Sequence, residues 1–177
     1  MKVFFDTEFT GLHQNTTLIS IGCVSEGDDK FYAELTDYDH SQVDEFVQCN
    51  VLPHLRRGSD TTPRKTGDHH DMFVVDNRRY VAMYLEEWLS DYPVVEMWGD
   101  CSAYDWTLFC QLFGGACGIP QNVSYIPRDL ATLFEARGID PDVDRWQFAG
   151  LTTESKHNAL VDAIAIRACF NKLDSNR

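Results

Sequence analysis

Residues 2–12 read Lys-Val-Phe-Phe-Asp-Thr-Glu-Phe-Thr-Gly-Leu, an apolar run that ends in two acidic residues separated by one threonine. The apolar start of this stretch predicts a short buried β-strand. Because successive side chains of a strand point to opposite faces, Asp6 and Glu8 should leave the same face. A solvent-exposed strand end would also explain these two acids. Phe9 and Gly11 favour a functional site instead, since a glycine lets the backbone approach a ligand closely.

Three further residues lie where a helix is expected to begin. Asp105 follows Ser-Ala-Tyr at the start of an apolar segment, and His157 and Asp162 belong to the run His-Asn-Ala-Leu-Val-Asp. If the four carboxylates converge, they repel one another strongly unless cations lie between them. Hard oxygen ligands of this kind suit Mg²⁺ or Mn²⁺, and a nearby histidine suits proton transfer near neutral pH. Together these residues predict a two-metal nuclease.

Taken in order, the motifs resemble those of the DEDDh exonucleases, a superfamily that includes ribonuclease T, oligoribonuclease and the proofreading subunits of DNA polymerases. The superfamily has Asp-x-Glu at the end of the first strand, an aspartate at the start of a middle helix, and His-x-x-x-x-Asp near the C-terminus. In this chain the motifs are formed by Asp6 with Glu8, by Asp105, and by His157 with Asp162. The resemblance therefore spans most of the chain.

The resemblance implies a 3′-to-5′ exonuclease, with RNA favoured over DNA, that releases nucleoside 5′-monophosphates from single-stranded 3′ ends. It implies two Mg²⁺ or Mn²⁺ ions held by the four carboxylates, with His157 accepting the proton of the attacking water. Residues 47–55, Val-Gln-Cys-Asn-Val-Leu-Pro-His-Leu, also resemble a segment of a small bacterial and phage exoribonuclease subfamily. Residues next to the motifs are candidates for contact with the terminal nucleotide: Thr7, Phe9, Leu12, Ser102 and Tyr104.

Two of these motif residues also have simple local explanations. Acidic residues favour the first turn of a helix, which alone would account for Asp105, and His157 could be a surface histidine. A separation of five residues rotates two side chains by about 140° on one continuous helix. We therefore expect His157 in the loop before the last helix and Asp162 on that helix. The sister group has Tyr-x-x-x-Asp, but Asn158 stands at the tyrosine position, which leaves the histidine class.

The chain is expected to be an α/β protein with a ribonuclease H-like fold, as the resemblance implies. Its central sheet would be mixed, with three antiparallel strands followed by parallel strands, and flanked by helices. Strands are expected at 2–6, 17–25, 30–34, 94–98 and 124–126, and helices at 41–50, 77–91, 104–113, 130–137 and 158–173. The polar segment 58–70 predicts a mobile loop. We expect a single exonuclease domain over residues 1–177.

Composition is typical of a folded, reduced protein. Hydrophobic residues make up 44% of the chain, which disfavours disorder, and no apolar run approaches the roughly 20 residues that span a bilayer. The first residues turn acidic too early for a signal peptide. Six cysteines without a Cys-x-x-Cys pair predict buried, reduced thiols. We therefore expect a cytoplasmic protein without membrane contact, and the resemblance suggests a homodimer.

Two other functions stay open, one suggested by the net charge of the chain and one by the strand that ends in Asp6. A net charge of −13 repels nucleic acid, although bound metals would offset part of it and segment 56–79 carries a net +2. An acidic protein that mimics nucleic acid would explain this charge. A haloacid-dehalogenase-type phosphatase would explain a strand that ends in Asp6. That chemistry uses Asp-x-Asp, however, where this chain has Glu8, and it leaves His157 and Asp162 without a role.

Overall fold

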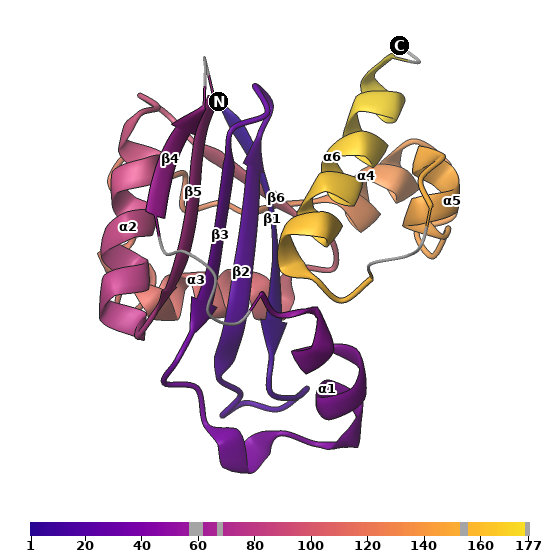
Figure 1. The fold of residues 1–177 in the computed structure, drawn as a ribbon. Helices are drawn as coiled ribbons and strands as arrows, with labels where there is room; N and C mark the ends of the chain where they lie inside the picture. The colour runs from indigo at the N-terminus through magenta and orange to yellow at the C-terminus, as the bar shows by residue number, and fades with distance from the viewer. Residues whose placement is uncertain (57–61, 67–68, 153–155, 176–177) are drawn as a thin grey trace.

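The computed structural model describes residues 1–56, 62–66, 69–152 and 156–175. Within these residues, seven strands form one sheet in the order β4-β5-β3-β2-β1-β6-β7 (Figure 1). The strands are β1 (Lys2–Phe9), β2 (Leu18–Ser25), β3 (Lys30–Leu35), β4 (Thr62–Thr66), β5 (His69–Asp76), β6 (Glu96–Gly99) and β7 (Arg128–Asp129). Strands β1, β2 and β3 pair antiparallel, whereas β6 runs parallel to β1 and β7 parallel to β6. This mixed sheet confirms the predicted ribonuclease H-like fold class.

Helices lie on both sides of the sheet (Figure 1). One side carries α2 (Arg78–Ser90) and α3 (Ala103–Leu112), and the other carries α4 (Leu130–Ala136), α5 (Arg145–Ala149) and α6 (Ala159–Ser175). Helix α1 (Glu45–Asn50) lies near one end of the sheet. Short 3₁₀ turns occur at His40–Gln42, Leu52–His54 and Ala116–Gly118. The sheet is thus buried between two helical layers.

Strand β1 is central, and its two faces belong to different hydrophobic cores. Val3 and Phe5 pack in the cluster that includes residues of α2 and α3, whereas Phe4 packs in the cluster of α4 and α6. Because strand side chains alternate, the residues that follow continue this division. Asp6 and Glu8 therefore fall on the α6 side, and Thr7 falls on the α3 side.

The loop expected at 58–70 is in part a pair of strands. Thr62–Thr66 form β4, which pairs antiparallel with β5 from His69 onward. Pro63 is tolerated because β4 is the edge strand, where one side of the backbone needs no partner. Polar residues are common on such an edge, so composition alone does not separate it from a loop. The remaining positions of that prediction, 58–61 and 67–68, lie outside the described residues.

Two other local predictions were wrong, and one short helix was missed. No strand forms at 124–126. Pairing near this position is limited to an isolated bridge between Val95 and Val123 before it and to the short β7 after it. The helix expected at 41–50 is divided, because Asp44 accepts a hydrogen bond from the Val47 N–H and starts α1 there. The five-residue α5 was not predicted, because such a short helix has too few residues to show a periodic pattern.

Among the described residues, no helix is both long and apolar enough to cross a membrane. All six cysteines are free thiols. The expected burial holds for Cys23, Cys110 and Cys169, but it was wrong for Cys49, Cys101 and Cys117, which are exposed. Those three residues lie near element ends rather than within the apolar core, a difference that apolar neighbours in the sequence do not reveal.

Candidate active site

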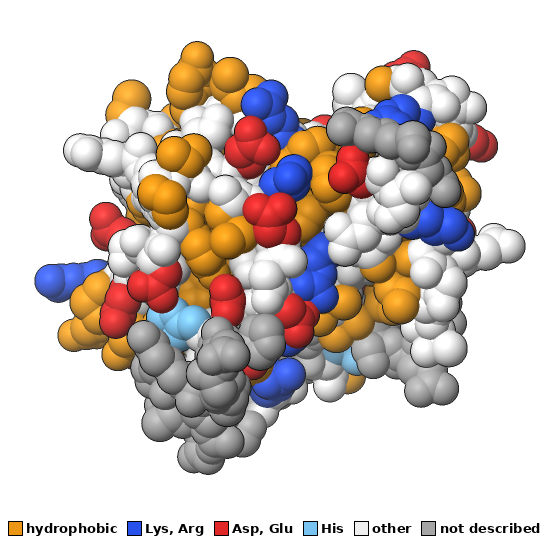
Figure 2. Space-filling model, turned by 90° about the horizontal axis from the view of Figure 1, so that it is seen from above, with side chains coloured by type: hydrophobic (Ala, Val, Ile, Leu, Met, Phe, Trp, Pro, Cys, Tyr) orange, Lys and Arg blue, Asp and Glu red, His pale blue; other side chains and the backbone are white. Residues whose placement is uncertain are grey.

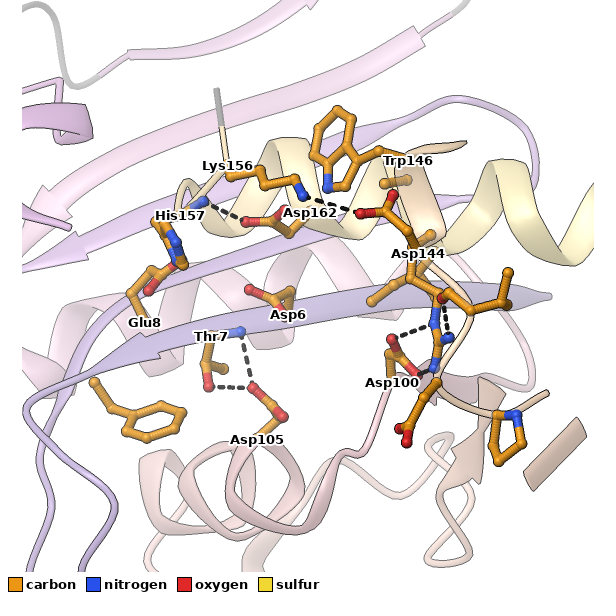
Figure 3. A pocket seen from close by; sticks show the side chains of 17 residues that line it. Asp6, Thr7, Glu8, Asp100, Asp105, Asp144, Trp146, Lys156, His157 and Asp162 are labelled. Carbon is orange, nitrogen blue, oxygen red and sulfur yellow. Dashed lines mark hydrogen bonds and ion pairs between the residues drawn. The ribbon is translucent and has the colours of Figure 1, made fainter. Parts of the chain in front are cut away.

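A cleft of about 510 Å³ opens where the end of β1 meets the beginnings of α3 and α6 (Figure 3). Its far wall is the segment 141–146, which leads into α5. The five predicted catalytic residues all line this cleft: Asp6, Glu8, Asp105, His157 and Asp162. Three parts of the chain that are far apart in sequence therefore meet at one place.

Three carboxylates form a compact group on the α6 side of β1. Asp162 lies in the first turn of α6, and one oxygen each of Asp6, Glu8 and Asp162 lies within 4.8 Å of the others. Gly22, which pairs with Asp6 in the neighbouring strand, permits this approach. A Cβ at Gly22 would lie 2.2 Å from the backbone nitrogen of Leu160, a distance that no side chain could occupy. Helix α6 can rest on β2 only because this position is glycine.

Asp105 reaches the cleft from the other face of β1. One oxygen of this first-turn residue of α3 accepts hydrogen bonds from the Thr7 backbone N–H at 3.0 Å and from the Thr7 hydroxyl at 2.5 Å. It is not a member of the three-carboxylate group. Among the neighbouring charges, however, Asp105 has the largest effect on the pKa of Asp6. The alternation of β1 thus places Asp6 between acidic residues from two helices.

His157 lies in the segment just before α6, as the spacing predicted. Its φ of 66° is in the left-handed region, where histidine occurs more often than most residues that carry a Cβ. Its backbone N–H donates to Oδ2 of Asp162 at 2.9 Å, and its ring meets that of Phe46 edge to face at 5.4 Å. The neighbouring Asn158 is buried and donates to the His54 carbonyl at 3.1 Å. These contacts hold the imidazole at the cleft.

Burial and mutual repulsion make these carboxylates bind protons tightly. Burial raises the pKa of Asp6 well above its usual range, and the charges of Asp105, Asp162 and Glu8 raise it further. Burial, then the charges of Asp162 and Asp105, raises the pKa of Glu8 to about 8. Burial also raises the pKa of Asp162 to about 6, although two backbone N–H groups oppose this. Two like charges at such a separation repel by about 3 kcal/mol at an effective dielectric constant of about 20.

The donor set fits a small, hard divalent cation. Asp6, Glu8 and Asp162 present carboxylate oxygens that converge within 4.8 Å, and Mg²⁺ and Mn²⁺ prefer such ligands. The basic side chains in the described lining, Arg145 and Lys156, are each paired with a carboxylate outside this group. A cation would favour the ionised carboxylates, and so oppose the burial and repulsion that raise the pKa values of Asp6 and Glu8. The residues present are therefore suited to hold a metal.

Comparison with protein families gives a match over residues 1–173 to the 3′-5′ exoribonuclease Rv2179c-like domain. The chain belongs to this family. It is 32% identical over 165 residues to the 3′-5′ exoribonuclease Rv2179c of Mycobacterium tuberculosis strain H37Rv, a match that covers 92% of this chain and 87% of the relative. The 3′-5′ exoribonuclease MT2234.1 of strain CDC 1551 gives the same values. These matches confirm the resemblance at the level of a 3′-5′ exoribonuclease family.

The candidate substrate contacts of this exoribonuclease-family chain are not all at the cleft. Thr7 and Phe9 line it. Tyr104 stacks on Phe9, with ring centroids 5.4 Å apart and an interplanar angle of 20°, and lines a second pocket of about 290 Å³. Leu12 is 79% exposed and Ser102 is buried, and neither lines the cleft. Among the predicted contacts, Phe9 is therefore the aromatic side chain that lines the cleft.

Sequence reasoning missed most of the far wall. Asp100 accepts hydrogen bonds at 2.7 and 2.8 Å from Arg145, which begins α5. Asp144 caps α5 by accepting from the Gln147 N–H at 2.8 Å, and it pairs with Lys156 at 3.3 Å. Asp100 could have been found, since it directly follows an apolar strand, as the first motif does. Lys156 could also have been found, since it directly precedes His157. Arg145 gave no such signal, because only the fold brings it to the cleft.

Proposed function

We propose that this chain is a metal-dependent 3′-5′ exoribonuclease of the DEDDh type. It would hydrolyse single-stranded RNA from the 3′ end and release nucleoside 5′-monophosphates. The observation that carries the proposal is the group formed by Asp6, Glu8 and Asp162, with oxygens within 4.8 Å of one another, in a chain of an exoribonuclease family. Asp105 and His157 line the same cleft and complete the motif set.

In this proposal, Asp6, Glu8 and Asp162 would hold one Mg²⁺ or Mn²⁺ ion, and Asp105 together with Asp6 would hold a second. Bound divalent ions of this kind would supply activation of a water and stabilisation of negative charge on the leaving oxygen. The backbone around Thr7 would hold the terminal nucleotide. The ring of Phe9 offers an apolar wall beside the carboxylates, on which a base of any identity can stack.

His157 has the properties of a proton acceptor in this site. Burial, followed by the charges of His54 and Lys156, lowers the pKa of His157 below 6.5. The imidazole is therefore neutral at pH 7 and has a free ring nitrogen for the proton of the attacking water. Its neighbour Asn158 and the Phe46 ring restrict how far it can move. We assign His157 the role of general base.

Family membership and geometry favour this function over the two alternatives. A haloacid-dehalogenase-type phosphatase would leave His157 and Asp162 unused, yet both line the cleft together with Asp6. A protein that mimics nucleic acid should carry its negative charge as a continuous acidic surface. On the face shown in Figure 2, acidic and basic side chains are interspersed with hydrophobic ones. Among the described residues, the acidic side chains close enough to share a metal ion are those of the cleft, Asp6, Glu8 and Asp162.

A directional assay tests the proposal. With Mg²⁺, single-stranded RNA labelled at its 5′ end should give a ladder of shortening products, and RNA labelled at its 3′ nucleotide should release a labelled mononucleotide at once. A DNA oligomer of the same sequence should be degraded more slowly. Asp6→Asn keeps the shape of the side chain and should reduce the rate by at least about 10³-fold, since it removes a ligand of both ions. Equal rates for this variant and the wild type would refute the assignment.

The homodimer suggested by the resemblance and the cytoplasmic location suggested by composition stay predictions. A chain of 20.3 kDa gives monomer and dimer masses that light scattering separates readily. The measurement should be made with and without Mg²⁺, because the ion changes the charge of the cleft. Fractionation of the source cells would test the location.

A further inference from the structure

The cleft contains a lysine that the proposed chemistry does not use. Lys156 directly precedes His157, and its Nζ lies 3.3 Å from Oδ2 of Asp144 on the far wall (Figure 3). The two side chains are 40% and 46% exposed, so the pair is in contact with solvent at the edge of the cleft. Exposed ion pairs of this kind contribute about 0–1 kcal/mol. Lys156 can therefore leave Asp144 at little energetic cost.

Asp144 keeps its structural role without the lysine. Its Oδ1 accepts the Gln147 N–H at 2.8 Å and thereby caps α5, whereas Lys156 contacts the other oxygen. Departure of Lys156 would leave the cap bond in place and return Oδ2 to solvent. The ion pair is thus an exchangeable contact and is not needed to hold the wall.

Arg145, the other basic residue of the described lining, is not exchangeable. Its Nε and Nη2 donate to the two oxygens of Asp100 at 2.7 and 2.8 Å, and its Nη1 donates to the Val143 carbonyl at 2.6 Å. The guanidinium group also lies 4.8 Å from the centroid of the Phe134 ring. A bidentate, part-buried pair of this kind is among the stronger charge contacts. Arg145 therefore stabilises the wall and is not free to bind a ligand.

The charge of the cleft opposes the entry of an anionic ligand, so a free cation at the opening would favour its binding. Its described lining has two basic side chains against seven carboxylates: Asp6, Glu8, Asp100, Asp105, Asp142, Asp144 and Asp162. An RNA strand carries one negative charge at each phosphate, and such a surface repels it. Metal ions at the three-carboxylate group would offset part of this negative charge. Lys156, whose Nζ extends from beside His157 toward Asp144 on the far wall, can act on another phosphate of the strand.

We propose that Lys156 leaves Asp144 and binds a backbone phosphate of the RNA strand when a 3′ end enters the cleft. The inference rests on the proposed function and deepens it by naming a residue that recognises the substrate. Contacts to phosphate carry no sequence information, so this lysine serves any RNA sequence. Because Lys156 adjoins His157, whose N–H binds Asp162, the bound phosphate lies next to the reacting groups.

Binding and turnover of four variants test the inference. Affinity is measured by fluorescence anisotropy with 5′-labelled single-stranded RNA in Ca²⁺, and KM and kcat are measured in Mg²⁺. Lys156→Gln should raise both Kd and KM by about 10- to 100-fold, the usual effect of losing a hydrogen bond to a charged group, and change kcat by less than about threefold. The slope of log Kd against log salt should become shallower by about 0.7, the value for one phosphate contact on a single strand. Lys156→Arg should restore most of the affinity.

Asp144→Asn and Lys172→Gln are the matched controls. Asn caps helices as well as Asp does, so Asp144→Asn breaks the same ion pair but leaves the lysine free, and it should lower Kd or leave it unchanged. Lys172 lies on α6, outside the described cleft lining, and donates to the Phe148 carbonyl. Lys172→Gln should therefore leave Kd, KM and the salt slope unchanged.

The outcomes separate this inference from the proposed function. If the wild type degrades RNA but Lys156→Gln has wild-type Kd and salt slope, the lysine does not bind phosphate. If Asp144→Asn weakens binding as much as Lys156→Gln does, the ion pair itself is what matters, and the inference is overturned. If the wild type binds RNA through Lys156 without any metal-dependent turnover, the nuclease assignment fails and the phosphate contact stands. A wild type that neither binds nor degrades RNA overturns both.

Discussion

Glu8→Gln should stabilise the metal-free protein, although it removes a proposed metal ligand. Burial and the charges of Asp162 and Asp105 raise the pKa of Glu8 from its ordinary 4.5 to about 8. A tenfold difference in proton affinity corresponds to about 1.4 kcal/mol, so the ionised carboxylate costs the folded state up to about 5 kcal/mol. Relaxation and water contact reduce such penalties. We expect a gain of about 2–4 kcal/mol in the free energy of unfolding.

The gain should depend on pH with a definite sign. Because the folded-state pKa of Glu8 is raised, the penalty of its charge is fully present above about pH 8 and fades as the pH falls toward 4.5. Urea unfolding in EDTA, followed by tryptophan fluorescence, should show the full gain at pH 8.5 and less than about 1 kcal/mol at pH 5. Glu86→Gln, which removes an exposed carboxylate of α2, is the control and should change stability by less than about 0.5 kcal/mol.

Mg²⁺ should reverse the order of stability. Ligands that bind only the folded state raise its stability in proportion to the logarithm of their concentration, and the wild type should gain more from Mg²⁺ than Glu8→Gln does. Equal stability of Glu8→Gln and the wild type in EDTA at pH 8.5 would refute the reasoning. It would show that burial and the neighbouring carboxylates do not penalise the charge of Glu8 in the folded protein.

Three further predictions concern the position of α6 on the sheet, proton transfer by His157 and the requirement for a divalent cation. Gly22→Ala should lower kcat by about 100-fold or more while RNA binding weakens less. The new Cβ would lie 2.2 Å from the Leu160 nitrogen and would push α6 away from β2. A displacement of about 1 Å in a catalytic group can lower the rate by about 100-fold. A variant with wild-type kcat would show that α6 need not rest on β2. His157→Gly should lower kcat by about 10²–10⁴-fold without loss of thermal stability, because glycine accepts the positive φ. Wild-type turnover should fall as the pH drops below 6.5, toward the lowered pKa of this residue, since only neutral imidazole accepts a proton; an identical pH profile in the variant would exclude it as the base. Exhaustive chelation should abolish turnover, Mg²⁺ or Mn²⁺ should restore it and Ca²⁺ should not, so residual activity in EDTA would contradict a metal-dependent site.

Periodicity and motif spacing were enough to predict the part of the site that lies on β1 and α6. Strand alternation separates Asp6 and Glu8 from Thr7, and the five-residue spacing from His157 to Asp162 places one in a loop and the other on a helix. These are local properties of the backbone, which is why they can be read without the fold. The sequence also indicated the α/β class, because apolar strand segments and amphipathic helices follow each other in a definite order.

What lies opposite these residues was decided by the tertiary structure alone. The Arg145–Asp100 pair joins residues 45 positions apart, and the Lys156–Asp144 pair joins residues 12 positions apart. The sequence does not show that Gly22 is required for packing, because its contact with α6 is formed only in the folded structure. The strand pair β4–β5 likewise depends on an available sheet edge, which polar composition does not reveal. The sequence by itself determined which groups could carry the chemistry, because alternation and helix starts are short-range. The fold decided the distances between those groups, their pKa values and the shape of the cleft around them, because these properties depend on contacts between distant segments.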